Sequence, residues 1–269
     1  MAMQTVLITN DDGIFAPGIA ALVDAFSEHY TVIVAAPKVE QSGKGHSFTY
    51  QTGLTFEEST LFEEQHPSVK AYEITGAPAD CVKLALSHIL ATLPDFIISG
   101  INCGENLGIA SFYSGTAAAA REGAFWRIPS LAFSTSYDSC IHMSGYAVEA
   151  LAIFNHLLEH DQLQRATYSF YNINFPACKP SKAKGLKVCR QSLAYYCDKY
   201  RQEIDPTGKE HLFIDGAMRE IEDDLLYDIA ACRAGYITLT PLSIDSTKTD
   251  ALASLTTLTT MRPIKGDTQ

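Results

Sequence analysis

Apolar runs and helical patterns alternate along the first 160 residues of the chain. Short runs rich in β-branched residues predict buried strands, and the segments between them place apolar residues at helical spacing. Strands are expected at residues 6–8, 31–36, 72–75, 95–99 and 130–134, and helices at 17–26, 80–90, 117–125 and 145–159. Strands that alternate with helices imply right-handed crossovers. The pattern therefore predicts an α/β fold, with a mostly parallel sheet and helices on both of its faces.

The pattern changes after about residue 160. Residues 169–175 and 236–240 predict two further strands. Between them, a segment at about 188–214 is split by the turn signal Asp205-Pro-Thr-Gly, which predicts a β-hairpin. Its arms mix apolar and polar residues, and an isolated hairpin is marginally stable in water. We therefore expect this hairpin to pack on another subunit.

The domain organisation follows from these two regions. A chain of 269 residues is long enough for one large α/β domain or for a core with an appendage. We divide it into a Rossmann-like core, residues 1–160, and a C-terminal part, residues 161–269, which completes the sheet and carries the hairpin.

Composition and charge limit the class of partner. The chain is 46% hydrophobic and 19% charged, which is typical of a globular protein. Its formal net charge of −11 argues against binding long nucleic acids, which require a basic surface. A small phosphate ester can still bind where a metal ion supplies positive charge. We expect no membrane span, because no stretch approaches about 20 apolar residues. The first residues do not resemble a signal peptide, so a cytoplasmic location is expected.

The cysteines and histidines give no sign of a crosslinked or zinc-binding framework. The seven cysteines are scattered, and no pair has the spacing of a C-x-x-C motif. We therefore expect free thiols in a reducing compartment. His46, in the Gly-rich loop at 38–47, is either a surface residue or an acid or base near the substrate. The other seven histidines show no pairing that predicts a metal site.

Three loops that follow predicted strands carry oxygen-bearing side chains. In open α/β sheets, ligands bind at the carboxyl ends of the strands, near the switch in strand order, so these loops can converge. Adjacent carboxylates, a hydroxyl and an amide carbonyl form a hard-oxygen ligand set that suits Mg²⁺ or Mn²⁺ rather than zinc. The loops carry Asp11 with Asp12, Ser42 with Gly43, and Asn102 with Asn106 one turn further on.

A fourth element, Ser114-Gly115-Thr116, opens the helix expected at 117–125. Free backbone N–H groups and the helix dipole favour an anion there, and Gly115 permits close approach. A phosphate held at this point and at a metal ion would be polarised for attack by water. Each of the four signals also has an ordinary interpretation as a turn, a helix N-cap or a strand exit. Their coincidence on one edge of one sheet favours a site.

Two sets of aromatic residues are also candidates for stacking on a nucleobase. We interpret Trp126 as a core residue, and Tyr195 and Tyr196 as residues that face a subunit contact.

Taken together, the motifs resemble those of the SurE family of stationary-phase survival proteins. The resemblance covers most of the chain and lies in the segments Ile8-Thr-Asn-Asp-Asp-Gly-Ile-Phe-Ala-Pro-Gly18, Val34-Ala-Ala-Pro37, Gln41-Ser-Gly43, Thr75-Gly-Ala-Pro-Ala-Asp-Cys-Val-Lys83, Ser99-Gly-Ile-Asn102, Glu105-Asn-Leu-Gly108, Tyr113-Ser-Gly-Thr116, Asn172-Ile-Asn-Phe-Pro176, Asp205-Pro-Thr-Gly208 and Gly235-Tyr-Ile-Thr-Leu-Thr-Pro-Leu242.

The resemblance implies a metal-dependent nucleotidase that acts on nucleoside monophosphates. It implies one Mg²⁺ or Mn²⁺ per subunit and homodimers or homotetramers that exchange C-terminal segments, including the hairpin. The residues implied as metal ligands are Asp11, Asp12, Ser42 and Asn102. Those implied around the phosphate are Gly43, Asn106, Ser114, Gly115 and Thr116.

The chain departs from the family pattern in one loop. The family commonly has Arg where this chain has Gln41, and small residues and Ser where it has Lys44-Gly-His46-Ser47. We therefore keep an alternative: a catalytically weakened nucleotide-binding or regulatory member of the same fold. For the enzyme, metal-bound water is the preferred nucleophile. Asp11 could instead orient that water or attack phosphorus directly.

Overall fold

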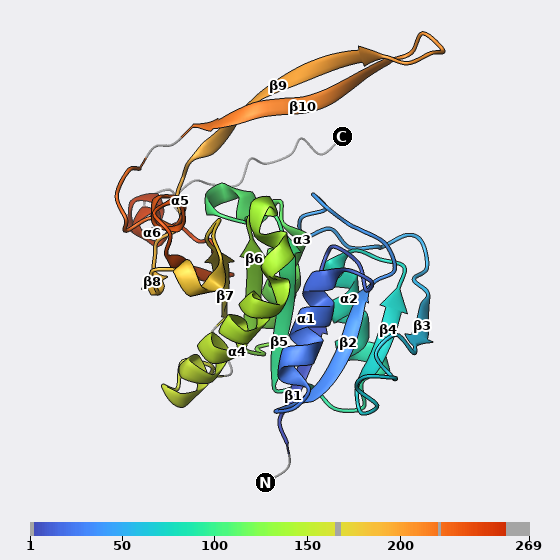
Figure 1. Ribbon diagram of the computed structural model, residues 1–269. Coiled ribbons are helices and arrows are strands. Elements are labelled where there is room, and N and C mark those ends of the chain that lie inside the picture. The colour runs from blue at the N-terminus through green and yellow to red at the C-terminus, as the bar shows by residue number, and fades with distance from the viewer. Residues whose placement is uncertain (1–2, 165–167, 220–221, 257–269) are drawn as a thin grey trace, which may run out of the picture.

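A single nine-stranded sheet forms the centre of the molecule. The structure is a computed structural model that describes residues 3–164, 168–219 and 222–256 (Figure 1). The strand order is β3-β4-β2-β1-β5-β6-β7-β11-β8. The strands are β1 (Thr5–Thr9), β2 (Thr31–Pro37), β3 (Phe56–Ser59), β4 (Lys70–Ile74), β5 (Phe96–Cys103), β6 (Ser130–Thr135), β7 (Ser169–Phe175), β8 (Leu186–Val188) and β11 (Ile237–Ser243).

The sheet is mostly parallel, as the alternation of strands and helices predicts. All neighbouring strands from β4 to β7 pair in parallel. β3 pairs antiparallel with β4, and β11 pairs antiparallel with β7. From β1 the chain crosses to β2 on one side, whereas from β5 it crosses to β6 on the other side. The switch in strand order therefore lies between β1 and β5.

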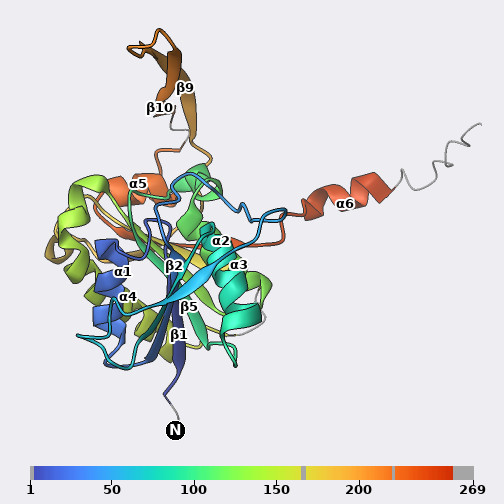
Figure 2. The ribbon, with the colours of Figure 1, turned by 90° about the vertical axis from the view of Figure 1, so that its right-hand side faces the viewer.

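Helices cover both faces of the sheet (Figure 2). Along β1, Val6 and Ile8 pack into the cluster beneath α1 and α4, whereas Leu7 packs into the cluster beneath α2. This alternation follows from the two-residue repeat of a strand buried on both faces. The helices are α1 (Pro17–Phe26), α2 (Pro78–Leu84), α3 (Gly115–Phe125), α4 (Met143–Glu159), α5 (Asp228–Arg233) and α6 (Thr249–Leu255).

Some predicted boundaries are wrong. The helix expected at 80–90 is divided into α2 and a π-helical turn, Ala85–Ile89. The strand expected to end at 99 continues as β5 to Cys103, after a register shift between Ser99 and Asn102. No helix within the described residues is long and apolar enough to cross a membrane.

The hairpin projects from the body of the molecule (Figures 1 and 2). It consists of β9 (Tyr195–Ile204) and β10 (Glu210–Arg219), so the expected span of 188–214 is wrong. Val188 belongs to β8 in the main sheet. The turn lies where it was predicted: Asp205 Oδ1 accepts hydrogen bonds from the N–H groups of Thr207 and Lys209. Polar residues interrupt both arms, so apolar periodicity does not mark their ends.

Candidate functional site

The two acidic residues lie directly after β1, at the switch in strand order. Asp11 is buried, with 3% of its surface exposed, and the Thr116 hydroxyl donates a hydrogen bond to its Oδ1. Burial raises the pKa of Asp11, and hydrogen bonds from Thr116 and from the Gly115 backbone oppose that rise. A Cβ on Gly115 would lie 2.7 Å from Asp11 Cβ. Glycine at this position therefore allows the first turn of α3 to approach the carboxylate.

Asp12 extends the acidic pair toward β5. The Cys103 N–H donates to Asp12 Oδ2 at 3.2 Å. Burial raises the pKa of Asp12 to about 6, with further contributions from the charges of Asp11 and Glu40. No basic side chain contributes to the shift of either aspartate among the described residues. The pair is thus a concentration of negative charge that a cation would stabilise.

Backbone hydrogen bonds attach the loop at 38–47 to Asp11 and to the segment before α3. The Gln41 N–H donates to the Asp11 carbonyl at 2.8 Å, and the Gly45 N–H donates to the Tyr113 carbonyl at 2.9 Å. The Ser42 hydroxyl donates to Glu40 Oε1 at 2.6 Å, which leaves its lone pairs available to accept or to coordinate. Ser42 and Gly43 both border the main cavity.

Two asparagines are oriented by the hydrogen bonds of their amide nitrogens. Asn102 Nδ2 donates to the Gly104 carbonyl at 2.7 Å, which leaves its Oδ1 free to bind a cation. Asn106 Nδ2 donates to Ser134 Oγ at 2.8 Å. Two side chains hold the backbone of Asn106. Asn174 Oδ1 accepts from the Asn106 N–H, and Asn172 Nδ2 donates to the Asn106 carbonyl, both at 2.8 Å. Both amide oxygens therefore remain for a ligand.

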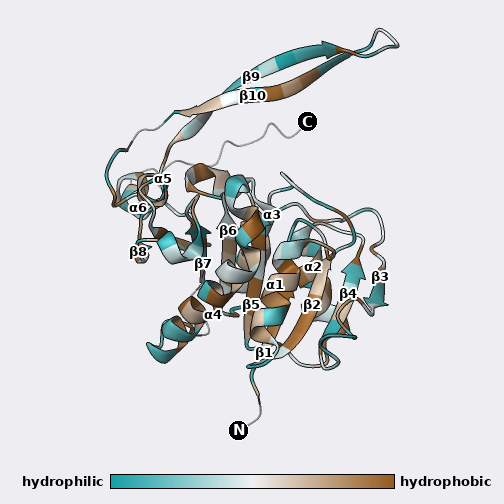
Figure 3. Ribbon diagram, viewed as in Figure 1, coloured by the Kyte–Doolittle hydropathy of each residue, from teal (hydrophilic) through white to brown (hydrophobic). Residues whose placement is uncertain are grey.

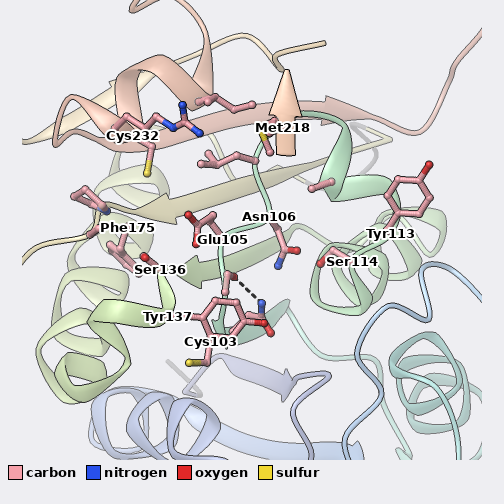
Figure 4. Close-up of a pocket in the computed structure, with 18 of the residues that line it drawn as sticks. Cys103, Glu105, Asn106, Tyr113, Ser114, Ser136, Tyr137, Phe175, Met218 and Cys232 are labelled. Carbon is pink, nitrogen blue, oxygen red and sulfur yellow. Dashed lines mark hydrogen bonds between the residues drawn. The ribbon is translucent and has the colours of Figure 1, made fainter. Parts of the chain in front are cut away.

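Ser114 is the N-cap of α3 and also lines the cavity. Its Oγ accepts a hydrogen bond from the Ala117 N–H at 3.0 Å. The ordinary N-cap interpretation is therefore correct, and the hydroxyl still faces the cavity (Figure 4). Gly115 and Thr116 do not line the cavity but contact Asp11.

The cavity has a volume of about 630 Å³. Six residues expected from the sequence line it: Asp11, Ser42, Gly43, Asn102, Asn106 and Ser114. Its far wall consists of residues that the sequence did not identify, because they come from the C-terminal part: Phe175, Pro176, Cys178, Met218, Ile229, Cys232 and Arg233. Tyr113 and Tyr137 stand at its rim, 65% and 75% exposed (Figure 4).

His46 is neither a free surface residue nor a residue that lines the main cavity. Its Nε2 lies 2.9 Å from Oε2 of the buried Glu122, and its ring stacks on Phe125. Lys83 Nζ lies 3.1 Å from the other oxygen of Glu122. Trp126 was expected in the core but is 38% exposed, and its indole N–H donates to Glu122. Glu122 thus ties the loop at 38–47 to α3.

The prediction that all seven cysteines are free thiols is wrong for two of them. Cys103 and Cys140 form a disulfide with Cα atoms 5.7 Å apart, whereas Cys81, Cys178, Cys189, Cys197 and Cys232 are free. The bond joins the end of β5, beside Asn102, to the 3₁₀ helix Tyr137–His142. Pairing across 37 residues depends on the tertiary fold, so spacing along the chain does not reveal it. The cytoplasmic location stays a prediction.

The residues at the edge between β1 and β5 fit a hard divalent cation. Two carboxylates, a serine hydroxyl and an amide oxygen are the donors that Mg²⁺ and Mn²⁺ prefer. The orientation of Asn102 and the uncompensated aspartates support this fit. Beside them, Asn10 Oδ1 is a buried oxygen without a hydrogen-bond partner among the described residues. The fold and the site thus define a doubly wound α/β protein with a cluster of carboxylate, hydroxyl and amide side chains at the switch point.

Comparisons with known proteins agree with this class. The family model described as "Survival protein SurE" matches residues 6–198. A protein from a Cyanothece species named 5′-nucleotidase SurE is 38% identical, over 94% of this chain and 95% of its own. A protein of the same name from Cytophaga hutchinsonii is 37% identical, over 95% and 96%. The crystal structure of the SurE protein from Aquifex aeolicus is 34% identical, with a TM-score of 0.79, and the match covers 95% of this chain and 99% of that one. The chain belongs to the SurE family.

Proposed function

We propose that this protein is a metal-dependent 5′-nucleotidase that hydrolyses nucleoside monophosphates to a nucleoside and inorganic phosphate. The observation that carries this proposal is the acidic pair beside the first turn of α3. Asp11 is buried and lines a cavity of about 630 Å³, and Asp12 lies next to it, partly buried. The names of close relatives over nearly the whole chain support it.

In this proposal, Asp11, Asp12, Ser42 and Asn102 hold one Mg²⁺ or Mn²⁺ ion. An ion held by these residues would supply charge neutralisation at the phosphate and would activate a water molecule for attack. The aspartates are placed by backbone and side-chain hydrogen bonds, so their geometry exists before the substrate binds. Such preorganisation lowers the cost of stabilising the charge that develops at phosphorus.

The phosphate would be held by other residues that line the cavity near the acidic pair. Ser114 offers its hydroxyl proton, Asn106 the second N–H of its side-chain amide, and Gly43 a backbone without a side chain in the way. The N-terminal end of α3 adds a positive partial charge. Loss of a phosphoryl group requires little beyond such positioning and charge neutralisation. The nucleoside would then extend toward the wall formed by the C-terminal part.

The loop departures do not favour the weakened, non-catalytic alternative. Gln41, Lys44 and Ser47 line a separate hollow of about 400 Å³, beyond the main cavity. His46 is paired with Glu122. None of the side chains that differ from the family pattern lines the main cavity.

Phosphate release from nucleoside 5′- and 3′-monophosphates, with Mn²⁺, with Mg²⁺ and after chelation, tests the proposal. We expect metal-dependent release by the parent protein and loss of at least about 100-fold in Asp12→Asn, because an acidic pair then loses one charge. Asp161→Asn, an exposed position remote from the cavity, is the matched control. Nucleotide binding without turnover under every condition would favour the alternative.

We also propose that the protein forms homodimers or homotetramers through the hairpin. Ile204, Leu212 and Ile214 on its arms are 69%, 60% and 72% exposed. Figure 3 shows the apolar stretch on β10. A two-stranded hairpin that stands away from its own core gains stability when such residues are covered. A second copy of the chain supplies that cover.

A further inference from the structure

Three potential metal ligands meet at the C-terminal end of α4. His156 and Glu159 lie in its last turn, and His160 is its C-cap residue. One ligand atom from each lies within 4.8 Å of the others, and all three residues are exposed. The sequence-based expectation included no histidine pairing that predicts a metal site, but the fold brings the ligand atoms of His156 and His160 close together. Within the described residues, this is the one group of three histidine, cysteine or acidic side chains that is close enough to share an ion.

The helix itself brings these side chains together. Residues separated by three and four positions lie on the same helical face, so both imidazoles and the carboxylate share one side of the last turn. The two imidazole rings have centroids 4.2 Å apart. His160 Nδ1 lies 2.8 Å from the His156 carbonyl oxygen. Because a carbonyl only accepts, Nδ1 carries the proton, and Nε2 of the neutral ring keeps a lone pair for a metal.

The local charge also favours a cation. The C-terminal end of a helix carries partial negative charge, and Glu159 adds a full negative charge. Tetrahedral bonds of about 2.1 Å place ligand atoms about 3.4 Å apart. Exposed side chains can close that distance from the present separation by rotating about their side-chain bonds.

This group is independent of the acidic pair. α4 runs antiparallel to the strands, so its C-terminal end lies at the opposite edge of the sheet from the main cavity (Figure 1). None of the three residues lines that cavity.

We propose that His156, Glu159 and His160 form a second metal site, which binds a borderline transition-metal cation such as Zn²⁺. Imidazole ligands suit zinc, copper and nickel, whereas the oxygen donors at the acidic pair suit Mg²⁺ and Mn²⁺. The two sites therefore differ in the metal that they prefer. A titration with Zn²⁺ should therefore detect binding at this second site, whereas a titration with Mg²⁺ should not.

Calorimetric titration of the metal-free full-length protein with Zn²⁺ tests this site. The Asp12→Asn variant should retain a zinc-binding event. Adding His156→Ala and His160→Ala to that variant should lower its affinity for Zn²⁺ by at least about 100-fold. Loss of a residue that hydrogen-bonds to a metal ligand already lowers metal affinity by about 10–100-fold, and loss of the ligand itself costs more. His29→Ala with His88→Ala removes two other exposed histidines and serves as the matched control.

The outcomes separate cleanly. The His156→Ala and His160→Ala changes should leave the circular dichroism spectrum and Mn²⁺-dependent phosphate release of the otherwise unaltered protein unchanged, because neither residue lies near the cavity. Unchanged zinc affinity in the double histidine variant would overturn the proposal. Absence of zinc binding in Asp12→Asn, or an equal loss in the His29→Ala, His88→Ala control, would overturn it too.

Discussion

The hydroxyl of Thr116, in the first turn of α3, donates a hydrogen bond to Oδ1 of Asp11, two residues beyond the end of β1. This contact joins the start of a helix to the carboxyl end of a strand across 105 residues of sequence. It fixes the orientation of a buried carboxylate that has no basic partner among the groups that shift its pKa.

Thr116→Val should therefore reduce activity more than it reduces stability. The substitution keeps the shape of the side chain but removes the hydroxyl. A hydrogen bond to a charged group is worth about 1.5–3 kcal/mol, or about 10–100-fold in rate if it acts mainly in positioning Asp11. Phosphate release at saturating substrate measures the effect.

Thr238→Val is the control for that experiment. Thr238 is also fully buried in the sheet, but its hydroxyl has no partner among the described residues. We expect the control to keep the parent rate. Equal rates in Thr116→Val and in the parent would contradict the role assigned to the contact.

Glu122→Gln should change the dependence of stability on pH. Burial alone would raise the pKa of Glu122, but the hydrogen bonds and charges of His46 and Lys83 lower it below its ordinary value. As pH falls, the unfolded chain therefore takes up this proton first. The stabilisation from ionised Glu122 is complete above the ordinary glutamate pKa and is lost as pH falls through the lower folded pKa.

We expect the parent protein to exceed Glu122→Gln in stability by about 1–3 kcal/mol at neutral pH, with a difference that shrinks below about pH 4. Urea denaturation at several pH values measures this. Glu28→Gln, on the exposed surface, should show no such trend. A difference between parent and variant that stays constant down to pH 3 would contradict the assignment.

The Cys103–Cys140 bond predicts a thiol count. The chain has seven cysteines, so the unreduced, denatured protein should show five free thiols and the reduced protein seven. Replacing both cysteines with serine should lower the free energy of unfolding by about 2–4 kcal/mol. Cys197→Ser, which removes a free thiol, is the control. Seven thiols before reduction would rule the bond out.

Substitutions on the hairpin should dissociate the oligomer. Leu212→Asp with Ile214→Asp places charge on its exposed apolar arm and should shift the mass measured by light scattering toward that of one chain. Val148→Asp, an exposed apolar position on α4, is the matched control. A monomeric parent protein, or an unchanged mass in the double variant, would contradict the proposed role of the hairpin.

The sequence predicted the features that depend on local pattern. Apolar periodicity located most of the strands and helices, though not β8, α5 or α6, and β1 and β5 then placed Asp11 and Asn102 on one edge of the sheet. Ser114 was recognisable because it precedes an alanine-rich helix. For the elements of the core, local preference and tertiary packing agree.

Features that depend on the tertiary fold could not be predicted in the same way. Glu122 and His46 are 76 residues apart, and Met218 reaches the cavity only because β10 ends beside it. No local spacing encodes either contact. The spacing of His156, Glu159 and His160 was readable in the sequence, and only the fold shows that their ligand atoms converge.

Anomalous diffraction from crystals soaked with Mn²⁺ tests the central claim most directly, namely that separate loops assemble one cation site at the switch between β1 and β5. We predict a manganese peak within about 2.0–2.3 Å of oxygens from Asp11, Asp12 and Asn102, with Ser42 at the same ion or joined to it through water. Soaked crystals that show no peak between these side chains, or show the ion elsewhere in the cavity, would contradict the account.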